Sequence, residues 1–302
     1  MKALITGGLG FVGTQLCSRL LKKGHAVTIV DHSPRPHSGT PPEVKYVAGD
    51  TTARGSWQDE VGKQDAIINL AGASIFRRWT DETKKLIHDS RVLTTRNVVE
   101  AMAQKRDVTL CSASAVGYYG FRGDEEVTEK GKPGDDFLAR LCSDWENEAH
   151  KASRDGARVV VTRFGIVLGK TGGALGQMIP AFKWFVGGPL GSGNQWFSWI
   201  HMEDLLGAIL FVLEKHDLEG PVNLCSPNPV RNKELAKALG KILGRPSFLK
   251  APGFMIRAIL GEFGSVLLEG QRVIPDRLLK EGFAFHYPEL TDALQEVVGK
   301  KR

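Results

Sequence analysis

The sequence contains few cysteines and no long apolar run. Its cysteines are Cys17, Cys111, Cys142 and Cys225, and none of them forms a C-x-x-C motif, so neither a zinc site nor a disulfide framework is indicated. The longest apolar run, Leu205 to Leu213, is far shorter than the roughly 20 residues that a membrane span needs. The amino end also lacks a signal-peptide pattern. We therefore expect a protein of the reducing cytoplasm, with no metal and no membrane partner.

Concentrated charge of one sign is missing as well. The 40 Lys and Arg residues against 34 Asp and Glu give a net charge of +6, but they are interspersed along the chain. Lys300 to Arg302 is the only dense basic run, and we interpret it as a solvated tail. Nucleic-acid binding needs a basic patch or stripe, so no nucleic-acid partner is expected. A chain of 302 residues with 42% hydrophobic residues can bury one large core and a smaller second one.

The first thirty residues carry a strand, a glycine-rich turn, a helix and a second strand. Gly7 permits a tight turn, Gly10 lets the backbone approach a diphosphate, and Gly13 lets the helix lie close to the sheet. The helix that follows presents free N–H groups and the positive end of its dipole. Asp31, at the end of the second strand, can accept hydrogen bonds from an adenosine ribose. The groups expected to bind the diphosphate belong to Gly7, Gly10, Phe11, Val12 and Gly13.

Strands and helices continue to alternate after this unit. Short apolar strands are predicted at residues 2–6, 26–30, 44–48, 66–70, 108–112 and 159–163. The clearest of the helices between them starts at Thr80 as its N-cap and runs towards Gln104. Alternation of this kind is typical of an α/β fold with a Rossmann-type, doubly wound parallel sheet, whose ligands bind outside the carboxyl ends of the strands.

Six motifs in one order give the chain a family resemblance. They are TGGLGFVG at the first turn, Gly49-Asp50, NLAG at Asn69–Gly72, CSASAVGYYG at Cys111–Gly120, RFGIVLG at Arg163–Gly169 and WIHMEDL at Trp199–Leu205. With these motifs the sequence resembles the extended short-chain dehydrogenase/reductase superfamily, which includes sugar-nucleotide epimerases and dehydratases. The resemblance implies a nicotinamide-nucleotide cofactor.

A narrower resemblance covers almost the whole chain. It rests on RRWT at Arg77–Thr80, SAVGYYG at Ser114–Gly120, GGPLGSGNQWFSWIH at Gly187–His201 and EGQRVIP at Glu269–Pro275. These segments resemble the atypical epimerase family of the YfcH type, whose reaction is generally not assigned and whose members end in a domain like DUF1731. The resemblance implies an NAD(P)-binding domain over residues 1–170 and part of 200–230. Residues 171–302 then supply mostly substrate-side segments, with a small C-terminal α/β domain over about 246–302.

The resemblance adds cofactor-binding residues beyond the first turn: Asp50, Leu70, Ala71, Gly72, Arg163 and Gly165. The choice between NAD and NADP stays open at this point. Asp31 favours NAD because it would bind the ribose 2′-hydroxyl and repel a 2′-phosphate. His32 and Arg35 could neutralise that phosphate, and the family resemblance also favours NADP.

The sequence departs from the superfamily at its acid/base pair. Superfamily enzymes use Tyr-x-x-x-Lys, in which the lysine lowers the pKa of the tyrosine so that the phenol can exchange a proton with the substrate. None of the four tyrosines here has a lysine four residues later. Arg140 stands about where the lysine should be, and Asp136 or Phe137 fills the tyrosine position.

Other polar groups near the strand ends are therefore candidates for catalysis. Ser112 and Ser114 alternate along one strand, so both can point towards the ligand and one can orient the substrate oxygen. Tyr118 or Tyr119 could supply a phenol. The alternative for this tyrosine pair is that it packs the loop.

Substrate-binding candidates lie in two loops and beyond them. Arg77, Arg78 and Trp79 suit a bidentate grip on an anion with a stacked ring, or else form a solvated loop. Trp196 belongs to a glycine-rich stretch that either closes over a small ligand or forms a rim packed on the core. His201 could contact substrate, although a capping role is favoured, and Arg231 could reach an anion.

These observations predict an NAD(P)-dependent epimerase or oxidoreductase that acts on a small polar substrate, which is either nucleotide-linked or anionic. The rival is a nucleotide-binding regulatory or scaffold protein that keeps the cofactor pocket without turnover. Whether the chain forms a homodimer is left open.

Overall fold

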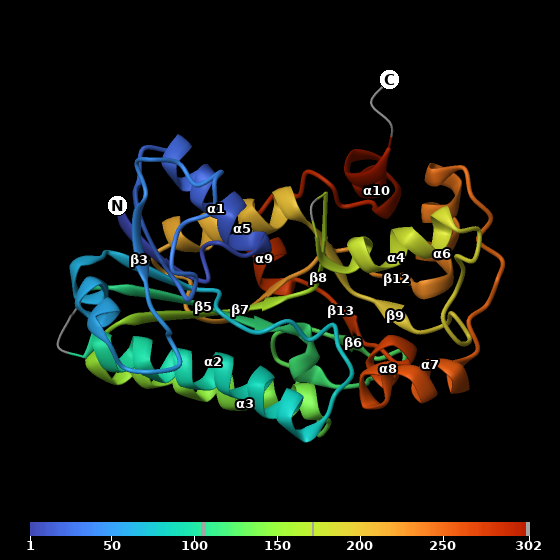
Figure 1. Cartoon of the computed structure of the whole chain (residues 1–302), viewed down its shortest axis with the longest axis horizontal. Coiled ribbons are helices and arrows are strands. Elements are labelled where there is room, and N and C mark those ends of the chain that lie inside the picture. Colours follow the sequence, from blue (N-terminus) through green and yellow to red (C-terminus); the bar gives the residue numbers. More distant parts are fainter. Residues whose placement is uncertain (104–106, 171, 300–302) are drawn as a thin grey trace.

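A seven-stranded sheet forms the centre of the protein (Figure 1). The computed structural model describes residues 1–103, 107–170 and 172–299; Gln104 and the tail predicted at Lys300 to Arg302 lie outside them. Along the sheet the strands are β11 (Gly220–Leu224), β7 (Arg158–Phe164), β5 (Thr109–Ala115), β4 (Ala66–Asn69), β1 (Lys2–Thr6), β2 (Ala26–Asp31) and β3 (Lys45–Ala48). All neighbouring strands are parallel. The strand order reverses between β1 and β4, which places a topological switch point there.

Helices cover both faces of this sheet (Figure 1). One layer holds α1 (Phe11–Lys22) and α5 (Met202–Glu214), and the other holds α2 (Asp81–Met102) and α3 (Phe137–His150). Successive side chains of β1 alternate between the layers: Leu4 packs with α2, whereas Ala3 and Ile5 pack with α1 and α5. This two-sided burial explains why the strands read as continuous apolar runs in the sequence.

The predicted strands match the observed ones closely. β1 has the predicted bounds, and β5 continues to Ala115, beyond the predicted end at Ser112. Thr80 is the N-cap of α2, with its hydroxyl accepting from the Thr83 N–H group. The extension of β5 matters because it places Ser114 at the carboxyl end of the strand.

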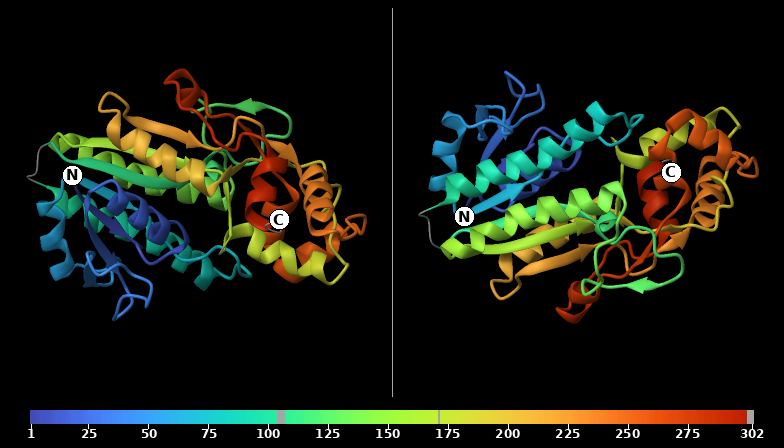
Figure 2. Two further views of the ribbon diagram at one scale, coloured as in Figure 1. Left: turned by 90° about the horizontal axis from the view of Figure 1, so that it is seen from above. Right: turned by 90° about the horizontal axis from the view of Figure 1, so that it is seen from below.

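A second, mostly helical lobe packs beside the carboxyl ends of the strands (Figure 2). Its elements are β8 (Ile166–Gly169), α4 (Gly173–Lys183), β9 (Trp196–Phe197), β10 (Trp199–His201), β12 (Val230–Arg231), α6 (Asn232–Leu243), α7 (Gly253–Leu260), α8 (Glu262–Leu268) and α10 (Leu290–Val298). Leu175 of α4, Leu239 of α6 and Leu294 of α10 share one apolar core. The last helix, α10, therefore packs the end of the chain against α4 and α6.

The remaining elements are short connections. They are η1 (Ser56–Lys63), η2 (Val116–Tyr119), β6 (Glu126–Val127), η3 (Lys151–Asp155), β13 (Arg272–Val273) and α9 (Asp276–Lys280). Among the helices of the described residues, none is both long and apolar enough to cross a membrane. A search of the same residues finds no group of three or more His, Cys, Asp or Glu that could hold a metal ion. All four cysteines are buried free thiols.

Candidate functional site

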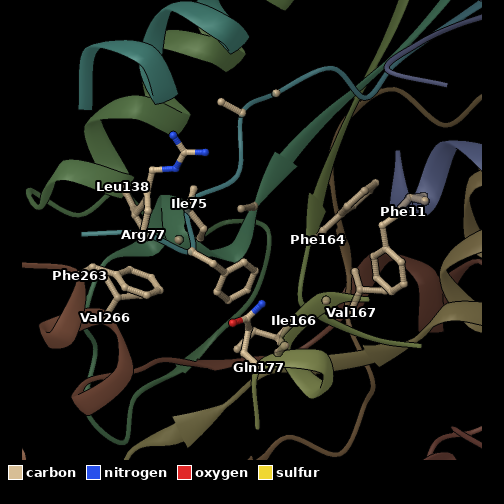
Figure 3. Close-up of a pocket in the computed structure, with 18 of the residues that line it drawn as sticks. Phe11, Ile75, Arg77, Leu138, Phe164, Ile166, Val167, Gln177, Phe263 and Val266 are labelled. Atoms are coloured by element: carbon tan, nitrogen blue, oxygen red, sulfur yellow. The ribbon is translucent and has the colours of Figure 1, made fainter. Parts of the chain in front are cut away.

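A cavity of about 1360 Å³ lies at the carboxyl ends of the strands, between the sheet and the helical lobe. Its walls come from the turn after β1, the ends of β2, β4, β5 and β7, one face of α3, and segments of α4, α7 and α8. Figure 3 shows part of this cavity, where Phe11 and Val167 lie on one side and Leu138, Phe263 and Val266 on the other. The cavity thus joins the glycine-rich turn to the second lobe.

Gly7 and Gly13 of the glycine-rich turn leave no room for a side chain. Gly7 has φ +68°, and a Cβ there would lie 2.8 Å from the Ala71 Cα atom. A Cβ on Gly13 would lie 2.5 Å from the Gly7 carbonyl oxygen. Gly10 is the N-cap of α1, so the first N–H groups of this twelve-residue helix face the cavity without intrahelical partners. The turn therefore fits a diphosphate on backbone donors, as the sequence predicts.

The end of β2 forms the next part of the wall. The buried Asp31 carboxylate accepts hydrogen bonds from the N–H groups of Leu9, at 3.2 Å, and Ser33, at 3.4 Å. His32 lies beside it, with 3.1 Å between its Nδ1 and Asp31 Oδ1, and its side chain is 87% exposed. Arg35 is exposed and does not line the cavity, so the structure does not support the cofactor role predicted for it. His37, which the sequence analysis missed, does line the cavity.

Asp50 also borders this part of the cavity. Its Oδ1 accepts hydrogen bonds from the Thr52 hydroxyl at 2.7 Å and the Thr52 N–H group at 2.9 Å, which lower the pKa of the carboxyl. Leu70, Ala71 and Gly72, which follow β4, line the floor as predicted. Gly165, after β7, lies in the lining too.

The two serines of β5 have different environments. Ser112 is buried below the cavity and accepts a 3.3 Å hydrogen bond from Asn69 Nδ2, so the prediction that it orients substrate is wrong. Ser114 lines the cavity and donates a 2.6 Å hydrogen bond to Glu146 Oε1. Only Ser114 of this pair can contact a ligand.

Glu146 is held by a buried ion pair behind the cavity wall. Arg163 donates to both of its carboxylate oxygens, from Nε at 2.9 Å and from Nη2 at 2.7 Å. Both side chains are almost fully buried, with 4% and 6% exposed for Arg163 and Glu146. Arg163 is therefore not in the cavity lining and is engaged by a carboxylate, which contradicts the predicted contact with the cofactor.

The tyrosine pair packs behind the wall as well. The Tyr119 hydroxyl donates to Asn223 Oδ1 at 2.7 Å and accepts from Arg163 Nη1 at 2.9 Å. Tyr119 is fully buried, and burial raises the pKa of its phenol. The Arg163 guanidinium lies over the Tyr118 ring at 3.5 Å. Neither tyrosine lines the cavity, so the loop-packing alternative describes them and the catalytic role does not.

The face of α3 that lines the cavity is not the face that carries the predicted Arg140. Leu138, Leu141, Cys142 and Trp145 line the cavity. Arg140 is exposed and bonds the Asp135 carbonyl, because it is two residues from Leu138 and so projects from a different side of the helix. Asp136 caps the helix. Arg140 therefore does not replace the catalytic lysine. On the cavity face, burial raises the pKa of the Cys142 thiol to about 12.

A cation in the lining was missed by the sequence analysis. Arg91 of α2 lies against Gly72, where an added Cβ would be 2.9 Å from its Cζ atom, and over the Trp145 ring at 5.4 Å. It donates to the Ile87 carbonyl oxygen, and burial lowers the pKa of the guanidinium. Within residues 1–103, 107–170 and 172–299 it forms no ion pair with a carboxylate. Nothing in the local sequence distinguishes it from the surface arginines of other helices.

The predicted anion grip at RRWT is only partly formed. Arg77 lines the cavity, but Arg78 does not. Trp79 is buried and packs on Phe137 and Phe263 with ring centroids 5.0 and 5.4 Å away, so it anchors the loop and does not stack on a ligand.

Trp196 and Arg231 pair with each other. Trp196 lines the cavity, and the Arg231 guanidinium lies 3.8 Å from its ring centroid. The Asp124 Oδ1 atom accepts hydrogen bonds from both side chains, from Trp196 Nε1 at 2.8 Å and from Arg231 Nη2 at 2.6 Å. β9 and β12 pair here as an antiparallel rim, in line with the rim alternative. Arg231 is outside the lining, so its predicted contact with an anion is not supported.

His201 caps a helix. Its Nδ1 accepts from the Glu203 N–H group at the start of α5, and its Nε2 lies 3.1 Å from Glu296 Oε2. Burial lowers the pKa of the imidazole despite Glu296. The favoured capping role therefore describes this buried side chain, and the substrate role does not.

Comparison with known families agrees with this geometry. The profile of the NAD dependent epimerase/dehydratase family matches residues 3–225, which is more than half of the chain. The chain belongs to the NAD dependent epimerase/dehydratase family. Residues 251–297, which include α7, α8, α9 and most of α10, match a domain of unknown function, DUF1731. The family assignment predicted from the motifs is thereby confirmed.

Relatives within the epimerase/dehydratase family extend over nearly the whole chain. An Arabidopsis thaliana "Epimerase family protein SDR39U1 homolog, chloroplastic" is 42% identical, covering 99% of this chain and 87% of the relative. "Epimerase family protein YfhF" of Bacillus subtilis is 37% identical, covering 100% and 99%. These similarities include the second lobe as well as the sheet.

Two solved structures share the fold. The human epimerase family protein SDR39U1 (isoform2), solved with NADPH, has a TM-score of 0.85 at 35% identity and covers 98% of this chain and 99% of that one. UDP-glucuronic acid 4-epimerase from Bacillus cereus, solved with UDP-glucuronic acid and NAD, has a TM-score of 0.81 at 19% identity, covering 98% of each chain. The Rossmann-type fold predicted from the sequence is confirmed.

Proposed function

We propose that this protein is an NAD(P)-dependent oxidoreductase or epimerase. The observation that carries the proposal is the cavity that joins the glycine-rich turn after β1, Asp31 and Ser114 to the second lobe. Residues 1–170 with part of 200–230 would hold the nucleotide, and residues 171–302 would mostly face the substrate. The human relative solved with NADPH supports the cofactor class.

The protein's own groups would place the nucleotide along the strand ends. Backbone N–H groups at Phe11, Val12 and Gly13 would bind the diphosphate, and Asp31 with Asp50 would border the adenosine. The exposed imidazole of His32 is the group available for a 2′-phosphate, so NADP is favoured over NAD. When bound, the nicotinamide would supply or accept the hydride.

Ser114 would orient the substrate oxygen. Because its own proton is directed at Glu146, the Ser114 oxygen would act as the acceptor of a hydrogen bond from a substrate hydroxyl. Arg163 donates to both carboxylate oxygens of Glu146, so Glu146 is fixed behind the wall and holds the serine in place. The proton of the substrate hydroxyl would exchange with solvent.

A second function is favoured by the same α3 face. Leu138, Leu141 and Trp145 cannot transfer a proton, and the Cys142 thiol with a pKa of about 12 stays protonated at neutral pH. A protein that binds the nucleotide as a regulatory signal would need no acid/base group. A cytoplasmic setting suits both functions, because all four cysteines are free thiols.

Fluorescence titration with NADPH and NADH tests the nucleotide site. Gly10→Glu places a carboxylate at the start of α1 and should weaken binding at least a hundredfold. Gly62→Glu is the matched control, because no atom lies within 4 Å of a Cβ there. Unchanged affinity in Gly10→Glu would show that the diphosphate site is wrong. NADPH consumption with carbonyl compounds then separates the enzyme from the binding protein.

A further inference from the structure

The end of the cavity remote from the glycine-rich turn is apolar. Six side chains from four elements and one loop converge there: Phe76, Leu86, Leu138, Leu260, Phe263 and Val266. The Phe76 and Phe263 rings meet edge to face at 6.0 Å, which joins the loop before α2 to α8. Figure 3 shows Leu138, Phe263 and Val266 along one side of this space.

Some polar side chains of the cavity lining are engaged within the protein, whereas Gln177 projects into the cavity (Figure 3) and the buried Gln195 Oε1 atom has no hydrogen-bond partner among the described residues. The Gln195 amide donates to the carbonyl oxygens of Leu190 and Leu267, and the Gln271 amide donates to that of Val116. The charged lining residues away from the adenosine end are Arg77, Arg91 and Glu269. A nucleotide sugar brings a diphosphate and many hydroxyl groups, and each one buried without a partner weakens binding.

The apolar lining also reaches the protein surface. Val186 and Leu249 border the cavity, and both are exposed. Three more exposed apolar side chains are sequence neighbours of these two residues: Trp184 and Phe185, at the end of α4, and Phe248. An apolar rim of this kind is typical of an entrance for apolar molecules.

We propose that the substrate is a predominantly apolar ketone, aldehyde or alcohol, and not a nucleotide sugar. Its aliphatic or aromatic body would lie between α2, α3 and α8, and its oxygen would face Ser114. This inference rests on the proposed function, because Ser114 and the nucleotide site define where the oxygen lies. It replaces the polar, nucleotide-linked substrate that the family resemblance implied.

Calorimetric titration of the NADP⁺-loaded protein tests the substrate class. The probes are benzylacetone, methyl nonyl ketone and UDP-glucose. We expect saturable binding of at least one ketone and none of UDP-glucose. Phe76→Gln and Leu86→Gln should weaken ketone binding about tenfold, since each removes apolar contact area.

Two variants of matched exposure serve as controls. Phe121 is 41% exposed against 42% for Phe76, and Leu279 is 45% exposed against 48% for Leu86, but neither lines the cavity. Phe121→Gln and Leu279→Gln should leave ketone binding unchanged. Binding of UDP-glucose, or of neither ketone, overturns the inference. NADP⁺ affinity is measured first in every variant, so that failure of the nucleotide site, which would refute the proposed function, is seen separately.

Discussion

The Ser114 hydroxyl and the Glu146 carboxylate are joined by a 2.6 Å hydrogen bond that connects the cavity wall to a buried ion pair. Arg163 holds Glu146 from the other side and reaches the Tyr119 hydroxyl. A residue of the cavity is thereby positioned by groups that never touch the ligand. The arrangement places one oriented hydroxyl group, that of Ser114, in the cavity wall.

Glu146→Gln should destabilise the fold strongly. It leaves the Arg163 guanidinium buried without an opposite charge, and breaking a buried pair in this way costs about 3–5 kcal/mol. Urea unfolding measures the change. Glu214→Gln, which removes an exposed pair with Lys23, should change the unfolding free energy by no more than about 1 kcal/mol. Equal stability of the two variants would contradict the buried pair.

Ser114→Ala should lower kcat about a hundredfold for oxidation of an alcohol substrate, because the substrate hydroxyl loses the oxygen that orients it. NADPH affinity, measured by fluorescence, should stay the same. Ser112→Ala is the matched control on the same strand and should keep kcat within about twofold, since Ser112 is buried outside the lining. A loss of kcat in Ser112→Ala alone would reverse the assignment.

His32→Ala should weaken NADPH binding about tenfold and leave NADH binding unchanged. The exposed imidazole is the group beside Asp31 that can bond a 2′-phosphate, and hydrogen bonds to charged groups contribute about 1.5–3 kcal/mol. Titration of both nucleotides measures the difference. His216→Ala, at an exposed site outside the lining, should affect neither. An equal loss for both nucleotides would show that His32 does not read the phosphate.

Glu129 should make stability depend on pH. Burial raises the pKa of its carboxyl, although the N–H groups of Asn223 and Arg277 donate to Oε1. The folded state therefore binds this proton more tightly than the unfolded state, whose pKa is near 4.5, and stability falls as pH rises through the folded pKa.

Glu129→Gln should remove this contribution. Relative to the natural protein, the variant should gain unfolding free energy as the pH of urea unfolding rises from 4 to 8. Glu214→Gln, which changes an exposed carboxyl, should show no such trend. A constant difference between Glu129→Gln and the natural protein at all pH values would mean that Glu129 titrates normally.

The nucleotide half of the protein could be predicted from the sequence because its rules are local. A strand, three spaced glycines, a helix and an acid lie within about thirty residues, and Gly13 is required by its contact with the Gly7 carbonyl inside that unit. The alternating strands fix a parallel sheet in the same way. Gly7, Gly10, Gly13 and Asp31 therefore lie where the sequence placed them.

The substrate half depended on contacts between distant segments. The Tyr119 hydroxyl is bound by Asn223, which is 104 residues away, and so does not reach the cavity. The Arg163 guanidinium is bound in the same way by Glu146, on the neighbouring helix. The face of α3 that lines the cavity, with Leu138, Leu141 and Trp145, was set by packing. Local backbone rules determine a strand, a turn or a helix start, but which buried polar groups pair, and so which side chains remain free for a ligand, is decided only when the chain packs.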